Sequence, residues 1–142
     1  MIKSSIFLSL IFVLTGFTFV NQSESVDPSH GQQERWVAPE KAKTLKNKRE
    51  ANASSIANGK KVFEARCQVC HGATGAGDGP GAKDLDPKPA TLASALVQDQ
   101  VDGEIYWKIS IGRGAMVKWG PILSKNDRWD LVNYIRTLKA SE

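Results

Sequence analysis

Cys67, Cys70 and His71 stand together near the middle of the chain, and their types and spacing suit one kind of covalent chemistry. Two residues separate the cysteines and the histidine follows directly, which is the arrangement of a c-type haem attachment site. In such a site each thiol adds to one vinyl group of the porphyrin, and the histidine supplies a nitrogen ligand to the iron. Because the chain holds 2 cysteines and 2 histidines, accident is a poor explanation of this spacing. The motif predicts one covalently bound haem c.

Other sites that use the same residue types match less well. A thioredoxin-like redox pair is typical of a strand-helix-strand context, and no strand-like run precedes Cys67. A zinc site needs two further ligands, whereas the other histidine, His30, lies far upstream in a polar stretch. No third cysteine exists to build a lasting disulfide framework.

The segments on either side of the motif predict a helix before it and a loop after it. From Ser55 to the motif, apolar residues such as Phe63 recur at helical intervals. Residues 72–81 combine repeated glycines with Asp78 and Pro80, too many flexible or rigid residues for a regular element. A phosphate-binding loop is not indicated, because no Lys-Ser/Thr pair opens a helix after it.

Two further helices are predicted in the C-terminal part. Asp102 is the predicted N-cap of a helix over 103–110. Ser124, with Asp127 three residues later, resembles a capping box at the start of the last helix. The apolar stripe of that helix consists of Leu131, Tyr134, Ile135 and Leu138.

The N-terminal segment, residues 1–22, has the features of an export signal. Lys3 gives it a positive start, and residues 6–20 are mostly apolar. A signal anchor that stays in the membrane is the alternative, because residues 4–23 carry no charge and about 20 such residues can span a bilayer.

The rest of the chain divides into a polar arm and a domain. Residues 23–54 predict a linker or arm, with a basic docking arm over 41–49 as the alternative. Residues 55–142 are the predicted haem-carrying domain. The net charge of +4 is a weak bias, and no basic tract is interleaved with aromatic residues, so nucleic acid is not indicated as a partner.

Met116 is the predicted ligand on the side of the iron opposite His71. Of the two methionines in the chain, Met1 lies in the leader, whereas Met116 lies in a glycine-rich loop just before the last helix. A thioether ligand favours Fe(II) and raises the reduction potential. The alternative is that Met116 fills the core, as most methionines do.

These features together resemble a monohaem, class I-type cytochrome c of bacteria, over about residues 55–138. The residues that carry the resemblance are Cys67, Cys70, His71, Gly72, the Gly77-Asp78-Gly79 loop, Met116 and the closing helix over 129–138. The chain departs from the family pattern at one point. Many relatives carry proline directly after the ligand methionine, whereas Val117 follows Met116 here.

The resemblance implies an all-α fold in which three to five helices wrap around a covalently attached haem. The N- and C-terminal helices of this small cytochrome c fold cross at close quarters. Gly59 and Phe63 match the first partner of the crossing, and Leu131 and Tyr134 match the second.

The resemblance also suggests residues around the haem and its ligands. A ligating histidine normally donates its other nitrogen to a carbonyl, and in the family a proline carbonyl accepts, so Pro80 and Pro89 are both candidates. Trp107, Trp119 and Arg113 are candidates to pack on the porphyrin or bond to its propionates. The alternatives for these three are ordinary core aromatics and a solvated arginine.

The expected function is one-electron transfer rather than enzymatic catalysis. An iron with six ligands has no open site, and the remaining residues offer no base, nucleophile or second metal. Redox proteins, one donor and one acceptor, are the expected partners, steered by lysines such as Lys83, Lys88 and Lys118. The expected location is the periplasm or the outer face of the cytoplasmic membrane.

Two alternative functions remain open on the sequence alone. In the first, residues 1–22 associate with the membrane and the chain is an anchored haem-bearing subunit of a respiratory complex, with the arm as a tether. In the second, the haem binds ligands or acts as a peroxidase, which requires an open sixth position on the iron.

Overall fold

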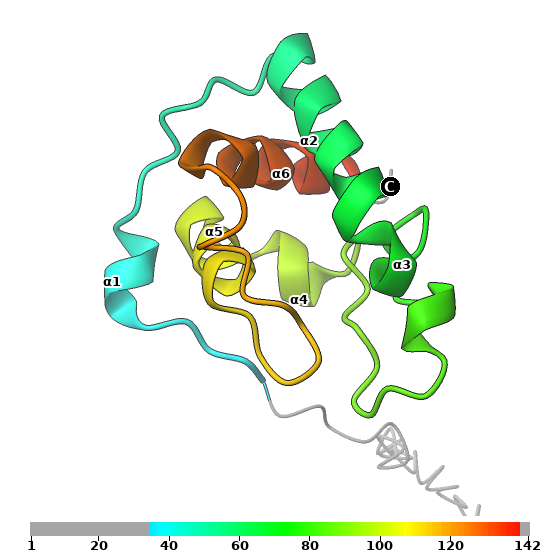
Figure 1. Ribbon diagram of the computed structural model, residues 1–142. Helices are drawn as coiled ribbons and strands as arrows, with labels where there is room; N and C mark the ends of the chain where they lie inside the picture. The colour runs from blue at the N-terminus through cyan, green and yellow to red at the C-terminus, as the bar shows by residue number, and fades with distance from the viewer. Residues whose placement is uncertain (1–34, 140–142) are drawn as a thin grey trace, which may run out of the picture. The chain divides into compact units, whose positions relative to one another are not determined.

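Two helices that lie far apart in the sequence cross at the centre of the fold. In the computed structural model, which describes residues 35–139, α2 (Ala53–Arg66) crosses α6 (Lys125–Thr137) (Figure 1). The backbones meet at Gly59, where an added Cβ would lie 2.0 Å from the carbonyl oxygen of Asp130. One turn further along α2, the ring of Phe63 packs with its centroid 5.2 Å from that of Tyr134. The predicted crossing of the first and last helices of the domain is confirmed.

The core of the described residues gathers around this crossing. Its members come from α2, α4, α5 and α6 and from the loop before α4, and they are Phe63, Leu92, Val97, Ile105, Ile109, Leu131, Val132, Tyr134 and Ile135. Here α4 spans Ala95–Gln98 and α5 spans Asp102–Ile111. Within the described part of the chain the secondary structure is helical apart from one isolated bridge between Arg113 and Met116. The all-α class is confirmed.

Three short helices and one 3-10 turn complete the fold. α1 (Glu40–Lys43) precedes the crossing pair, α3 (Gln68–His71) follows α2 directly, and η1 (Pro80–Ala82) lies in the glycine-rich loop. The described residues form six α-helices, one more than the expected upper number, because α1, α3 and α4 are four-residue helices that the periodicity of the sequence does not resolve.

The helix starts agree with the sequence at α6 and differ at α5. The hydroxyl oxygen of Ser124 accepts a hydrogen bond from the backbone N–H of Asp127 at 3.0 Å, so the predicted N-cap is confirmed. At α5 the N-cap is Val101 rather than Asp102, whose carboxylate instead accepts a bond from Arg136 at 2.9 Å. Asp102 therefore ties α5 to α6 and has no capping role.

The part of the predicted arm that the structure describes packs on α5 and α6. Ala42 is fully buried, and its carbonyl oxygen would lie 2.0 Å from a Cβ added at Gly103 of α5. Asn47 donates to the side-chain oxygen of Asn133 at 2.7 Å. The predicted signal segment lies outside the described residues, and the domain boundaries at 22 and 54 stay predictions. No helix among residues 35–139 is long and apolar enough to cross a bilayer.

A buried carboxylate on α6 joins the arm to the crossing. Asp130 is 1% exposed and accepts two bonds from the guanidinium of Arg49, at 2.9 and 3.0 Å. Asn58 of α2 donates to the same carboxylate at 2.9 Å. The cluster therefore joins the arm, α2 and α6. Removing a partner from a buried charge costs about 3–5 kcal/mol, so these contacts stabilise the fold.

We predict that Gly59→Ala destabilises the haem-loaded protein by about 1–3 kcal/mol, because the new methyl group overpacks the crossing. The direction of the change in stability is informative, because replacing glycine by alanine at an exposed position inside a helix stabilises a protein by up to about 1 kcal/mol. Urea unfolding followed by circular dichroism measures the change. Ala57→Val, at an exposed position of the same helix, is the matched control. Equal stability of Gly59→Ala and the wild type would contradict the close approach.

Candidate functional site

The three residues of the motif lie where α2 passes into α3. Cys67 ends α2, and its carbonyl oxygen accepts bonds from the backbone N–H groups of Cys70 at 3.1 Å and His71 at 2.9 Å. Both cysteines are free and half-buried. Burial, with the nearby Cys70 as a second cause, raises the pKa of the Cys67 thiol to about 12. A thiol held neutral in this way is unsuited to a thiolate redox pair.

The glycine-rich loop folds back onto the carbonyl end of α3. The N–H of Gly77 donates to the carbonyl oxygen of His71 at 2.8 Å, and the N–H of Gly79 donates to that of Cys70 at 3.2 Å. A Cβ added at Gly79 would lie 2.4 Å from the carbonyl oxygen of Val69. Glycine is required here because the loop backbone lies directly on the helix end. The loop thus fixes the last turn of the motif.

The imidazole of His71 has the protonation and the surroundings of a ligand. Its Nδ1 is buried and makes no hydrogen bond of good geometry, although the backbone of Ala90 is near enough to raise the pKa of the ring. Burial is the larger effect and lowers that pKa, so the ring is neutral at physiological pH. A buried polar atom without a full partner costs about 1–3 kcal/mol unless something compensates. A neutral ring beside two free thiols fits a haem c, with Cys67 and Cys70 as its attachment points.

The backbone near His71 includes a residue that the sequence did not indicate. The backbone that influences the imidazole is that of Ala90. The carbonyl oxygen of Pro89 would lie 2.3 Å from a Cβ added at Gly77, and Pro80 begins η1. A backbone contact from alanine leaves no signal in the sequence, and the roles of Pro80 and Pro89 stay predictions.

Met116 lies in a tight turn that folds back along α5. Its N–H donates to the carbonyl oxygen of Arg113 at 2.9 Å, and Gly112 at φ 61 starts the turn. Further on, the N–H of Trp119 donates to the carbonyl oxygen of Ile109 at 3.2 Å. Met116, Trp119 and Cys67 all pack, partly buried, against the same core. The fold therefore fixes the loop that carries the predicted second ligand.

Trp107 and Arg113, which were also predicted to contact the haem, lie against Trp36 of the arm. The ring of Trp107 lies 6.0 Å from that of Trp36, between centroids. The guanidinium of Arg113 lies 5.1 Å from the centroid of the Trp36 ring. Their predicted contacts with the porphyrin and its propionates stay predictions, as does that of Trp119.

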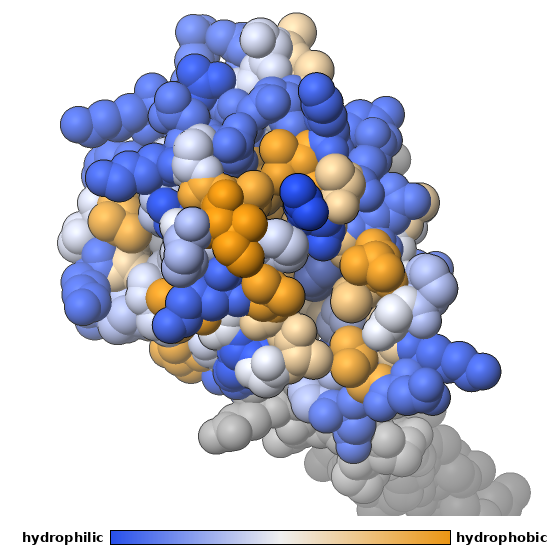
Figure 2. Space-filling model, viewed as in Figure 1, coloured by the Kyte–Doolittle hydropathy of each residue, from blue (hydrophilic) through white to orange (hydrophobic). Residues whose placement is uncertain are grey.

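An apolar area marks one face of the molecule. Figure 2 shows apolar side chains gathered near the middle of the face that Figure 1 presents, with hydrophilic side chains around them. Independently of that view, Val69, next to Cys70, and Val117, next to Met116, are exposed apolar residues. Apolar exposure beside both predicted ligand segments suits a surface that meets another molecule.

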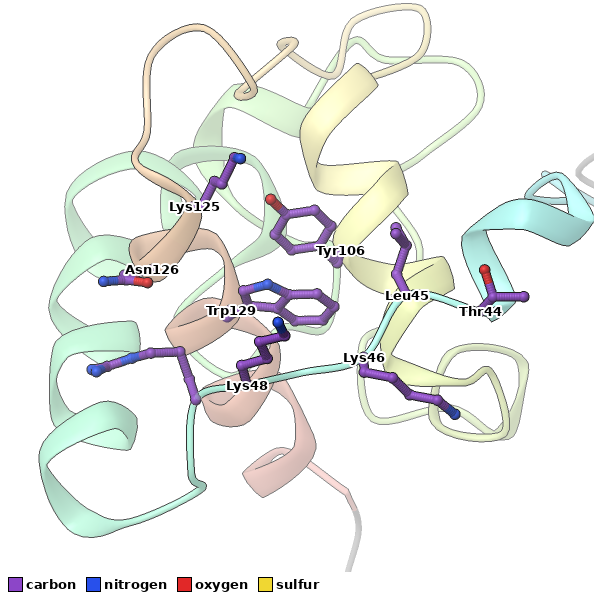
Figure 3. Close-up of a pocket in the computed structure, with 9 residues that line it drawn as sticks. Thr44, Leu45, Lys46, Lys48, Tyr106, Lys125, Asn126 and Trp129 are labelled. Carbon is purple, nitrogen blue, oxygen red and sulfur yellow. The ribbon is translucent and has the colours of Figure 1, made fainter.

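A separate hollow of about 650 Å³ lies between the arm, α5 and α6 (Figure 3). Tyr106 and Trp129 stack in it with their ring centroids 4.0 Å apart. The cations Lys46, Lys48, Arg49 and Lys125 also line it. It contains none of the residues predicted to hold the haem, so we do not assign it to that group.

Comparisons with known proteins show which family this chain is similar to. The cytochrome c family model matches residues 56–139, more than half of the chain, and the match includes the motif and Met116. A chain of the reducing HAO-like protein complex of Kuenenia stuttgartiensis is similar at a TM-score of 0.58 and 23% identity, over 68% of this chain and 50% of that one.

A second solved structure shares the fold. Cytochrome cL of the marine methylotrophic bacterium Methylophaga aminisulfidivorans is similar at a TM-score of 0.50 and 20% identity, over 67% of this chain and 58% of that one. The chain thus spans between half and three fifths of the length of these two solved chains. A search of the curated proteins finds no match.

We predict that the exported protein keeps its haem spectrum after complete denaturation, because thioether bonds survive unfolding. Intact-mass measurement should show the mass of the chain plus one haem. Cys67→Ala together with Cys70→Ala should release the haem on denaturation, whereas Val69→Ala, at the exposed position between them, should retain it. Haem that is extracted from the wild type by denaturant, or a mass with two haems, would contradict the assignment.

Proposed function

We propose that this chain, which belongs to the cytochrome c family, carries single electrons through one haem held between His71 and Met116. Membership of the family brings a covalently bound c-type haem and haem-based electron transfer. The ligand pair, the single haem and export from the cytoplasm are our proposals. We further propose that the protein works on the outer side of the cytoplasmic membrane.

The observation that carries this proposal is the environment of His71. Its half-buried imidazole ends α3, the helix that follows Cys67 and contains Cys70, so the ring lies beside two free thiols. Burial lowers the pKa of the ring and keeps it neutral, which is the form in which imidazole binds a metal.

The residues around the haem then have separate proposed roles. The bound haem takes up and gives up one electron. His71 is fixed by the loop bonds at its own carbonyl and at that of Cys70. Met116 supplies a neutral, polarizable sulfur, which favours the reduced iron. The core cluster around the crossing of α2 and α6 excludes water, which also raises the potential.

We propose redox proteins as partners, meeting the surface around Val69 and Val117. Lys83 and Lys118 are exposed and are the proposed steering charges on the rim of this surface. Lys88 differs from these two, because its ammonium group donates to the carbonyl oxygens of Ala82 at 2.8 Å and Lys83 at 2.5 Å. We therefore propose that Lys88 fastens the loop after η1.

We predict that Met116→Ala lowers the reduction potential by on the order of 0.1 V, because the iron loses a ligand that favours Fe(II). The oxidised protein should lose its far-red methionine-to-iron(III) absorption band and should bind added azide. Potentiometric titration and absorption spectra measure both effects. Val117→Ala, at the exposed neighbouring position, is the control. An unchanged potential and band in Met116→Ala would rule out this ligand.

An anchored subunit of a respiratory complex is the second candidate. The observation that favours it is the stretch 4–23, which holds no charged residue. The electron-transfer chemistry would be the same, and the segment before residue 35 would tether the domain to the membrane.

We predict that the signal segment is removed and that the mature protein stays in the supernatant after membranes are sedimented. Mass spectrometry of the exported protein should show the loss of about 20 residues from the N-terminus. Detection of the full-length mass, in the membrane fraction, would favour the anchored subunit over the free carrier.

A further inference from the structure

The ring of Trp36 lies close to two cations, Lys108 of α5 and Arg113 of the loop after it. The guanidinium carbon of Arg113 lies 5.1 Å from the ring centroid, and the ammonium nitrogen of Lys108 lies 5.7 Å from it. Both distances are in the range of cation–π attraction. The ring of Trp107 packs against Trp36 as well, at 6.0 Å between centroids. One side chain of the arm thus gathers three side chains around the start of the Met116 loop.

The segment that carries Trp36 is fixed by contacts of its own. Two residues later Ala38 is buried, and Ala42 of α1 packs its backbone against Gly103 of α5. These contacts do not use the Trp36 ring. The arm therefore presents the ring at a set position, and the side chains of Lys108 and Arg113 arrange themselves against it.

Arg113 is coupled directly to Met116. The two residues form an isolated antiparallel bridge, in which the N–H of Met116 donates to the carbonyl oxygen of Arg113. The turn begins at Gly112, where an added Cβ would lie 2.3 Å from the carbonyl oxygen of Met116. It also includes Gly114 at φ 56. Two glycines with positive φ make the turn easy to deform, so a contact that fixes Arg113 restrains Met116.

Without the Trp36 ring, the positive charges of Lys108 and Arg113 would repel each other. Burial lowers the pKa of Lys108, and the nearby Arg35 and Arg113 lower it further, whereas Glu104 raises it. The ammonium group of Lys108 also donates a hydrogen bond to the side-chain oxygen of Gln100 at 2.6 Å. The repulsion acts between Lys108 and Arg113. The electron-rich face of Trp36 offsets that repulsion.

We propose that Trp36 is a positioning residue for the sixth iron ligand, since it holds Arg113 and so fixes the turn that presents Met116. This inference rests on the proposed function, because it concerns the proposed ligand. The arm then helps to keep Met116 in the sixth coordination position of the iron.

The test compares variants of the full-length, haem-loaded protein. Trp36→Ala should raise the affinity of the oxidised protein for added azide by about five-fold, through easier release of Met116. The far-red methionine-to-iron(III) band should also weaken, because a smaller fraction of the molecules keeps Met116 on the iron. Trp36→Phe, which keeps a ring, should restore most of both properties. Val37→Ala, at the exposed next residue, should match the wild type.

The remaining outcomes separate this inference from the proposed function. If Met116→Ala abolishes the band while Trp36→Ala changes only the unfolding temperature, the proposed function stands and the positioning role is overturned. If the wild type lacks the band, both are overturned. A Trp36→Phe variant as open to azide as Trp36→Ala would also overturn the role of the ring.

Discussion

The contact between two backbones at Gly59 is the constraint on which the rest of the structure depends. With no Cβ at this position, α2 approaches α6 closely enough for Phe63 and Tyr134 to pack and for Asn58 to reach Asp130. The crossing sets the direction of α2, and α3 continues from its end. The attachment cysteines are therefore positioned by a contact two turns earlier in the chain, where no haem chemistry takes place.

Around the motif and the Met116 turn, the structure is held mostly by backbone groups. The carbonyl oxygens of Cys70 and His71 accept bonds from glycines, and the turn at Met116 is closed by another backbone bond. Backbone groups hold a shape at little entropic cost once the chain is folded, and they add no charge near the iron. Cationic side chains line the hollow between the arm, α5 and α6, whereas Lys108 and Arg113 lie near Trp36 at the start of the Met116 turn.

The sequence predicted those features that depend on short spacings. The Cys67-to-His71 motif, the cap at Ser124 and the stripe of the last helix are local patterns, and family and fold agree with them. The prediction that Asp102 caps α5 was wrong, because its carboxylate binds Arg136, which lies 34 residues away in the sequence. The approach of the Ala90 backbone to His71 was not predictable, because backbone contacts between loops leave no mark in residue type. The close packing of the arm on α5 was not predicted, because residues 23–54 are mostly polar and carry no periodic apolar pattern.

The bond between Arg49 and Asp130 has a consequence for the order in which the molecule can assemble. Its two partners are 81 residues apart, and Asp130 belongs to α6, the last helix of the described residues. The arm, although made early, cannot close until α6 is present, because loops of this length form late and α6 supplies its partners. Throughout that interval Cys67 and Cys70 belong to an open chain. Until this ion pair forms, the segment that carries Cys67 and Cys70 therefore remains accessible for attachment of a haem.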